Sequence, residues 1–157
     1  MKTWLFTVIM LCLIAATVTA EQRKPVKPLP KDKCPVCGMF VAEYPAFYAE
    51  IVFKDGFRAH FDGPKDMFRY YFEPEKYTPG RETADIAEVY VTDYYSLEAI
   101  DARRAFFISG SDVLGPMGGE LIPVSLESQA RTFLEDHKGK ALLKFGEITL
   151  ATVNSLD

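Results

Sequence analysis

Two of the three cysteines in this chain stand in one short segment, CPVCGM at residues 34–39. The third, Cys12, lies in an apolar N-terminal run that has the character of a cleaved export signal. Any internal disulfide of the mature protein must therefore join Cys34 to Cys37, and so small a loop would constrain few residues. The fold must come from a hydrophobic core without a disulfide framework, and the cysteine pair indicates a function more than a structural bridge.

Residues 1–20 have the parts of a secretory signal: a positive start, an apolar run at 4–16 and small residues leading to Ala20. We expect cleavage after Ala20. The apolar run is shorter than the roughly 20 residues needed to span a bilayer. Cys12 follows Leu11, where lipid attachment would want a small residue, so we do not expect membrane attachment.

The mature chain is small and acidic. Removal of the signal leaves 137 of the 157 residues, enough for one domain or two small fused units. The whole chain has 18 Lys and Arg against 22 Asp and Glu, and the signal contains one Lys and no acid, so the mature protein has 17 against 22 and a net charge of −5. An acidic balance without a basic stripe argues against binding to nucleic acid or to anionic membrane surfaces.

A short linker precedes two halves of similar length, which we place at 34–95 and 96–157. The linker, residues 21–33, contains three prolines and five Lys or Arg. This composition is typical of a polar, extended tether, and we expect it not to pack against the rest of the protein.

The first half predicts the order strand, strand, helix, strand. Asp55-Gly56 supplies a hairpin turn between two segments rich in aromatic and β-branched residues. Asp62 is predicted to cap the helix, and Pro74 to stop it. The predicted strands are 46–53, 57–61 and 86–92, and the helix is 63–73.

The second half repeats this order. Ser125 is predicted to cap an amphipathic helix at 126–138, which ends at Gly139. When Asp62 is laid on Ser125, the apolar positions of the two helices coincide, as expected for an internal duplication. The fold class is therefore α+β, with two tandem ββαβ units. The remaining predicted segments of the second half are strands at 105–109 and 120–124 and closing segments at 141–145 and 148–150.

The sulfur-bearing side chains are the main candidates for a site, because thiols and thioethers suit a soft metal ion, above all Cu(I). Cys34 and Cys37 are the strongest candidates, with an idle disulfide or inert thiols as the alternative. Met39 could be a ligand or could fill the core. Met117 stands between Pro116 and Gly118 in a loop, away from any periodic buried face, which favours a ligand over a residue that fills a gap.

The two histidines give weaker signals. His60 alternates with Ala59 and Phe61 in a predicted strand, so its side chain should point to the opposite face. It is either a surface residue or a further copper ligand. His137 lies in the last turn of the second helix, where a cation interacts well with the helix dipole. The two are far apart in the sequence, which makes a four-ligand structural zinc site a weak hypothesis.

Several motifs together resemble the NosL family of nitrous oxide reductase accessory proteins, and they occur in the same order over nearly all of the mature chain. They are the CPVCGM box at 34–39, the Asp55-Gly56 turn, the Asp66-Met67-Phe68 helical segment, the GPMG loop at 115–118 and the closing Phe145-x-Glu147-Ile148.

The resemblance implies a periplasmic Cu(I)-binding chaperone without catalytic activity. Its partner would be apo-nitrous oxide reductase or another copper enzyme. The implied Cu(I) ligands are Cys34, Cys37, Met39 and Met117, and the implied fold is two ββαβ units related to a region of organomercurial lyase. Many members of the family are lipoproteins, whereas this signal is of the soluble kind.

Other classes remain open at this stage. A Cys-x-x-Cys pair also serves thiol–disulfide exchange, but such a pair usually opens a helix, and here Gly38 leads into what the pattern predicts as a strand. A general heavy-metal-binding protein would use the same thiols. For a hydrolase or lyase the sequence offers no Ser-His-Asp pattern or phosphate loop, and only the fold relationship supports that class.

Overall fold

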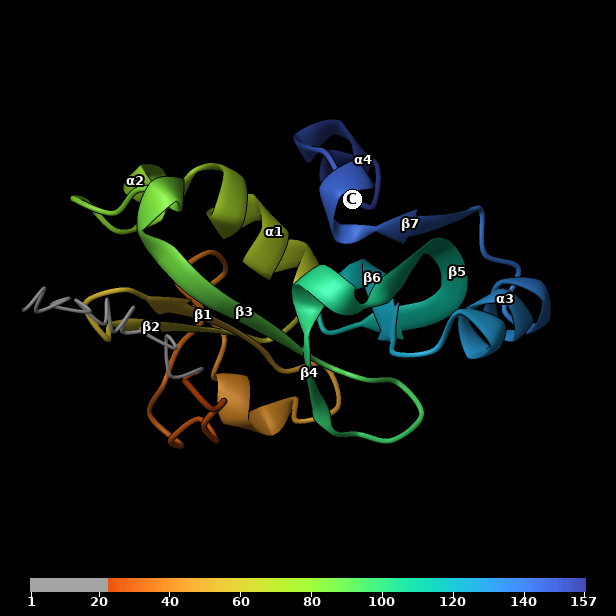
Figure 1. Ribbon diagram of the computed structural model, residues 1–157, viewed down its shortest axis with the longest axis horizontal. Helices are drawn as coiled ribbons and strands as arrows, with labels where there is room; N and C mark the ends of the chain where they lie inside the picture. Colours follow the sequence, from red (N-terminus) through yellow and green to blue (C-terminus); the bar gives the residue numbers. More distant parts are fainter. Residues whose placement is uncertain (1–22) are drawn as a thin grey trace, which may run out of the picture.

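The computed structural model describes residues 23–157, which form two antiparallel sheets with helices packed against them (Figure 1). The predicted α+β class and the ββαβ order of both units are confirmed. The predicted signal and its cleavage site after Ala20 lie outside the described residues. Within residues 23–157, no helix has the length and apolar character that crossing a membrane requires.

The first unit is built on a four-stranded sheet in the order β2-β1-β3-β4. The hairpin of β1 and β2 forms across the predicted turn, where Gly56 has a φ of +92°, a conformation that glycine adopts without strain. The short strand β4, which was not predicted, follows residue 95, so the first sheet extends past the boundary placed there. The strands are β1 (Ala49–Phe53), β2 (Arg58–Phe61), β3 (Ile86–Thr92) and β4 (Ala99–Asp101).

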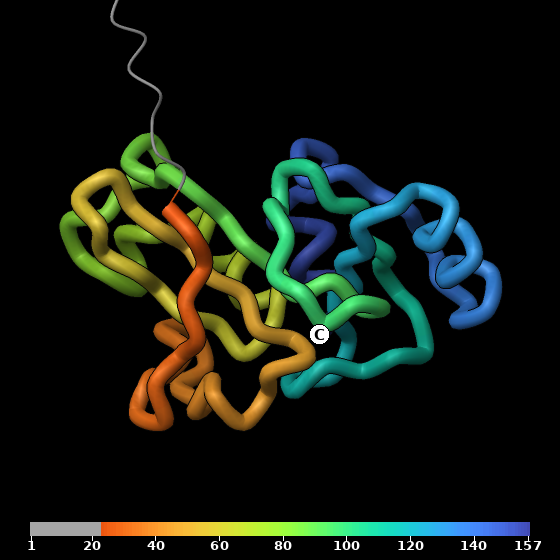
Figure 2. The backbone as a smooth tube through the Cα atoms, turned by 60° about the horizontal axis from the view of Figure 1, so that its bottom comes forward, coloured from red at the N-terminus to blue at the C-terminus, as the bar shows by residue number. Residues whose placement is uncertain are grey.

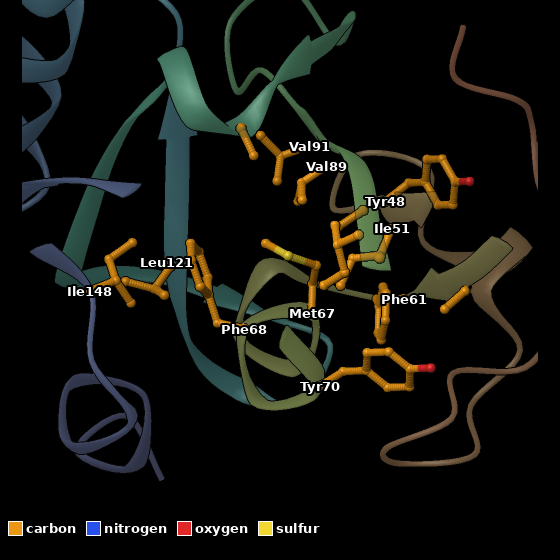
Figure 3. Close-up of a cluster of buried hydrophobic side chains, with 14 of the residues drawn as sticks. Tyr48, Ile51, Phe61, Met67, Phe68, Tyr70, Val89, Val91, Leu121 and Ile148 are labelled. Carbon is orange, nitrogen blue, oxygen red and sulfur yellow. The ribbon is translucent and has the colours of Figure 1, made fainter. Parts of the chain in front are cut away.

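Helix α1 (Pro64–Phe72) contributes to the core of both units. Met67 and Tyr70 point toward the first sheet, whereas Phe68 points toward Leu121 and Ile148 of the second unit (Figure 3). All of these side chains except Ile148 are fully buried. The core is therefore continuous across the two units, with α1 between them. Pro74 ends α1, as predicted, and begins the short helix α2 (Pro74–Tyr77).

The second unit is a three-stranded sheet in the order β6-β5-β7, with α3 packed against it around Ala130 and Phe133. The closing segment at 148–150 leads into a helix, α4, which was not predicted and which lies beside α1 (Figure 1). The elements are β5 (Phe106–Gly115), β6 (Gly118–Val124), α3 (Glu127–Asp136), β7 (Ala141–Lys144) and α4 (Leu150–Asn154). Short 3-10 helices span Val41–Glu43, Thr83–Asp85, Ala102–Arg104 and Phe145–Glu147.

The N-terminal segment packs along the first unit (Figure 2), so the prediction that residues 21–33 would not pack was wrong for their described part. The Tyr90 hydroxyl donates to the Arg23 carbonyl at 2.7 Å. The Val26 amide donates to the Glu50 carboxylate at 3.2 Å. Prolines keep this segment extended, but its other backbone groups remain free to bond the polar side chains of β1 and β3.

Both predicted helix caps were wrong. The N-cap of α1 is Gly63 and that of α3 is Leu126, and neither accepts a hydrogen bond with its side chain. Ser125 instead donates its amide to the Asp93 carboxylate at 2.6 Å. Asp62 turns away from the helix toward the cysteines. In both places a long-range contact replaced the local one that the sequence pattern favours.

Candidate metal centre

The CPVCGM box forms a tight turn, not the strand entrance predicted for it. Lys33 and Phe40 pair as an isolated antiparallel bridge on either side of it. The Cys34 amide donates to the Met39 carbonyl at 2.9 Å, and the Gly38 amide donates to the Cys34 carbonyl at 2.9 Å. Gly38 has a φ of +82°, which only glycine adopts readily. The turn places the two sulfur atoms within 4.8 Å of each other.

Two carboxylates at the start of α1 face these thiols. The Cys34 Sγ lies 3.5 Å from Asp66 Oδ2, and the Cys37 Sγ lies 3.2 Å from Asp62 Oδ1. One ligand atom from each of the four residues lies within 4.8 Å of all the others. Cys37 is the only member of the cluster that is not fully buried, so solvent and incoming ligands reach the cluster at Cys37.

The surroundings hold both thiols in the protonated form. Burial raises the pKa of Cys37 to about 12, and burial also raises the pKa of Cys34. The negative charges of Asp62 and Asp66 act in the same direction on Cys34, because a second negative charge beside them is unfavourable. Backbone amides that point at the sulfurs oppose this effect but do not overcome it. Each thiol must therefore lose a proton before it can bind a metal ion.

The two carboxylates differ in their partners. Asp66 accepts a hydrogen bond from the Arg69 guanidinium at 3.1 Å, which compensates its charge. Asp62 is 1% exposed, and among the residues described here its side chain hydrogen-bonds only to cysteine thiols. A buried carboxylate without a cation is unfavourable, so a metal ion bound at the cluster would also relieve Asp62.

Sequence reasoning missed Asp62 and Asp66 as residues of the site. Asp62 was interpreted as a helix cap, and Asp66 was noted only as part of a family motif. Asp66 lies in the first turn of α1, whereas Asp62 precedes the Gly63 N-cap and stands outside the helix. No local pattern marks either carboxylate, because their approach to the thiols depends on how the CPVCGM box folds against the start of α1.

The two candidate methionines lie in the CPVCGM box and in the turn between β5 and β6. Met39 directly follows Gly38 in the box and is partly buried. Met117 lies in the turn between β5 and β6, and its side chain is 46% exposed. The Met117 carbonyl accepts a hydrogen bond from Lys65 Nζ at 2.7 Å, and Lys65 is the neighbour of Asp66 in α1. The Met117 turn is therefore attached to the same helical turn that faces the thiols.

His60 lies outside the four-residue cluster. Its side chain points to the opposite face of β2 from Ala59, as predicted. Its Nδ1 is 2.8 Å from the Tyr48 hydroxyl, and its Nε2 is 3.8 Å from the Asp32 carboxylate. His60 also lines a surface hollow of about 200 Å³ together with Pro35. Only Nδ1 is thus within hydrogen-bond distance of a partner among the residues described here.

Comparison with known proteins identifies the family. The NosL family model matches residues 25–153, which is most of the chain. This chain belongs to the NosL family. The copper-binding lipoprotein NosL of Stutzerimonas stutzeri is 29% identical over 139 residues, which are 83% of this chain and 69% of that protein. The crystal structure of the copper chaperone NosL from Shewanella denitrificans shares 30% identity at a TM-score of 0.66, and the match covers 81% of this chain and 99% of that one.

Proposed function

We propose that this NosL-family protein is a periplasmic copper chaperone, which carries Cu(I) as cargo to nitrous oxide reductase or another copper enzyme. The observation that supports this most is the pair of unbridged thiols, Cys34 and Cys37, whose sulfur atoms lie within 4.8 Å of each other. Two thiolates and two thioethers form a soft donor set of the kind that Cu(I) prefers. The relatives named above are a copper-binding lipoprotein and a copper chaperone.

Loading requires that the thiols give up their protons. Asp62 and Asp66 accept hydrogen bonds from the thiols at 3.2 and 3.5 Å, so an acceptor for each displaced proton is already in place. Cu(I) binding then exchanges an S–H bond for an S–Cu bond and releases the proton through a carboxylate to solvent. The affinity for Cu(I) should rise with pH, because the thiolate is the ligand.

Release requires that some ligands be open to replacement by a partner. Cys37 is partly exposed and the Met117 side chain is 46% exposed, whereas Cys34 is 1% exposed. A partner's ligands can therefore replace Cys37 and Met117 first, while the Cys34 thiolate remains bound to the ion. Such stepwise exchange suits a carrier and needs no catalytic turnover.

The geometry favours metal transport over thiol–disulfide exchange. Reactive dithiols have a lowered thiol pKa, often because the pair opens a helix. Here burial raises the pKa of both thiols, and the box forms a turn followed by a 3-10 helix over Val41–Glu43. His60 is a weaker ligand candidate than the two cysteines, because it lies outside their cluster and its Nδ1 is already bonded to the Tyr48 hydroxyl.

The test is an anaerobic titration of the reduced mature protein, residues 21–157, with Cu(I) against a competing chelator. We expect the C34S/C37S variant to lose at least about 100-fold in affinity and Met117→Leu to lose about tenfold, which corresponds to about 1.4 kcal/mol. Met67→Leu is the matched control, since Met67 is a fully buried core thioether, and it should leave the affinity unchanged. Full affinity in C34S/C37S would contradict the proposal. If the wild type binds Cu(I) through the cysteines, a second experiment tests the client: transfer of the bound copper to apo-nitrous oxide reductase would identify that enzyme as the recipient.

A further inference from the structure

Lys65 is a buried charge beside the candidate metal centre. It is 1% exposed, whereas lysine is almost never fully buried unless it is paired. Its Nζ donates to the Met117 carbonyl at 2.7 Å and lies 3.4 Å from Asp157 Oδ1. The two groups that satisfy this buried ammonium are the Met117 carbonyl and the Asp157 carboxylate, so Lys65 ties the Met117 turn to α1.

The backbone of Lys65 is also bound to the second unit. Glu120 on β6 accepts the Lys65 amide at 2.6 Å and so takes the place of a cap for α1. The same oxygen, Oε1, accepts the Leu121 amide at 2.8 Å. Gly63 makes this approach possible, because a Cβ atom there would lie 2.2 Å from Glu120 Oε2. Lys65 is therefore bonded to the β5–β6 hairpin at two points, through its side chain to the Met117 carbonyl and through its backbone amide to the Glu120 carboxylate.

The Met117 turn is closely seated on both sides. A Cβ atom on Gly115 would lie 2.8 Å from the Glu120 carboxylate, and one on Gly119 would lie 2.6 Å from the Leu156 carbonyl oxygen. Gly118 has a φ of +85°, which closes the turn sharply. A turn held in this way presents Met117 at a defined place instead of sampling many positions.

We infer that Lys65 is a positioning residue for Cu(I) binding, which fixes the Met117 turn against α1 and thereby sets the contribution of the Met117 thioether to affinity. This inference rests on the proposed function. Lys65 does not touch the ion, because its ammonium has no lone pair to donate and points at a carbonyl. Its side chain links the methionine of the second unit to the helical turn whose next residue, Asp66, faces Cys34.

A double-mutant cycle for Cu(I) affinity tests the inference, with Lys65→Leu, Met117→Leu and the double variant measured against the wild type. If Lys65 acts through Met117, each single variant should lose about tenfold and the double variant also about tenfold, whereas independent effects would multiply to about 100-fold. Lys76→Leu is the control, since that lysine is exposed on α2 and its partners, Glu73 and Tyr77, are close to it in the sequence, and it should not change the affinity.

Three outcomes would overturn the inference. The losses of Cu(I) affinity could multiply in the double variant, or Lys65→Leu could keep an affinity within about twofold of the wild type. The third is a loss of affinity in Lys65→Leu while Met117→Leu keeps full affinity. If Lys65→Leu does not fold, Lys65→Gln, which keeps a donor on a shorter chain, enters the same cycle. C34S/C37S is measured in parallel. Full affinity in that variant would mean that the proposed function itself fails, which is a separate result from an additive Lys65 cycle.

Discussion

Cys34 and Cys37 combine a strong preference for soft metal ions with low reactivity toward other chemistry. The thiolate is the nucleophile, so a thiol with a raised pKa reacts slowly with oxidants and alkylating reagents. Cu(I) can still bind, because a strong metal–sulfur bond compensates for the lost proton. Burial would thus protect the pair from oxidants without removing it from the metal chemistry proposed above.

This argument predicts slow alkylation of Cys37 in the folded protein. With a pKa of about 12, the thiolate fraction at pH 8 is about 10⁻⁴, against about a quarter for an ordinary cysteine of pKa 8.5. We expect iodoacetamide to modify Cys37 of a C34S variant at least about 100-fold more slowly in the folded protein than in urea. The rate should rise about tenfold for each pH unit up to pH 10. Mass spectrometry of quenched samples measures the rate, and equal rates in the two states would contradict the prediction.

At the scale of elements, the start of α1 is where the two units meet. Glu120 from β6 is completely enclosed there and accepts two backbone amides. Burial raises the pKa of this carboxyl to about 8, although the two amides and Lys65 act against the shift. Glu120 therefore keeps its proton in the folded protein at pH values where an unfolded chain would have lost it, which links the stability of the junction to pH.

The sign of this linkage follows from the two pKa values. The pKa of Glu120 is about 8 when folded and about 4.3 when unfolded, so between them the folded state binds more protons. Its contribution to stability is complete below about pH 4 and declines as pH rises to about 8. We expect the free energy of unfolding in urea to fall by about 3 kcal/mol more between pH 5 and pH 8 for the wild type than for Glu120→Gln.

The matched control for this measurement is Glu127→Gln, because Glu127 is exposed on α3 and pairs only with Arg131 nearby. That variant should keep the pH dependence of the wild type. A Glu120→Gln variant with the same slope as the wild type would show that Glu120 is ionised in both states.

The elements also show which parts of the fold sequence reasoning can reach. β3 was predicted to the residue, and the β1–β2 hairpin was predicted with β1 starting three residues too early, because a glycine turn and alternating β-branched residues are local signals. The caps at Asp62 and Ser125 were wrong, because Glu120 and Asp93, distant in the sequence, supply the interactions instead. The Cys34–Cys37 pair was found from spacing alone, whereas its carboxylate neighbours depend on how the box folds onto α1, which no local pattern encodes.

For the whole molecule, the main question is whether two tandem units behave as one. The larger apolar core includes residues of both units, and Phe68 of α1 is the clearest link between them. Its ring lies 5.2 Å from the ring of Phe107 on β5 and 5.0 Å from that of Phe145. The C-terminal Asp157 adds ion pairs to Lys65 and Arg69 of α1. Neither unit buries its apolar face without the other, so they should unfold together.

Phe68→Ala tests this coupling. Removal of a fully buried aromatic ring should lower the free energy of unfolding by about 3 to 5 kcal/mol, and calorimetry should still show one transition, with equal calorimetric and van't Hoff enthalpies. Phe133→Ala, in the smaller cluster beside α3, should lower that same transition. Leu126→Ala, which removes a side chain that is 56% exposed, should change stability by less than about 1 kcal/mol. Two separate transitions, with Phe133→Ala shifting only one of them, would mean that the units are independent. In that case the placement of Met117 against α1 would depend on docking between folded units, and the contribution of Lys65 to Cu(I) affinity would fall as temperature approaches the lower transition.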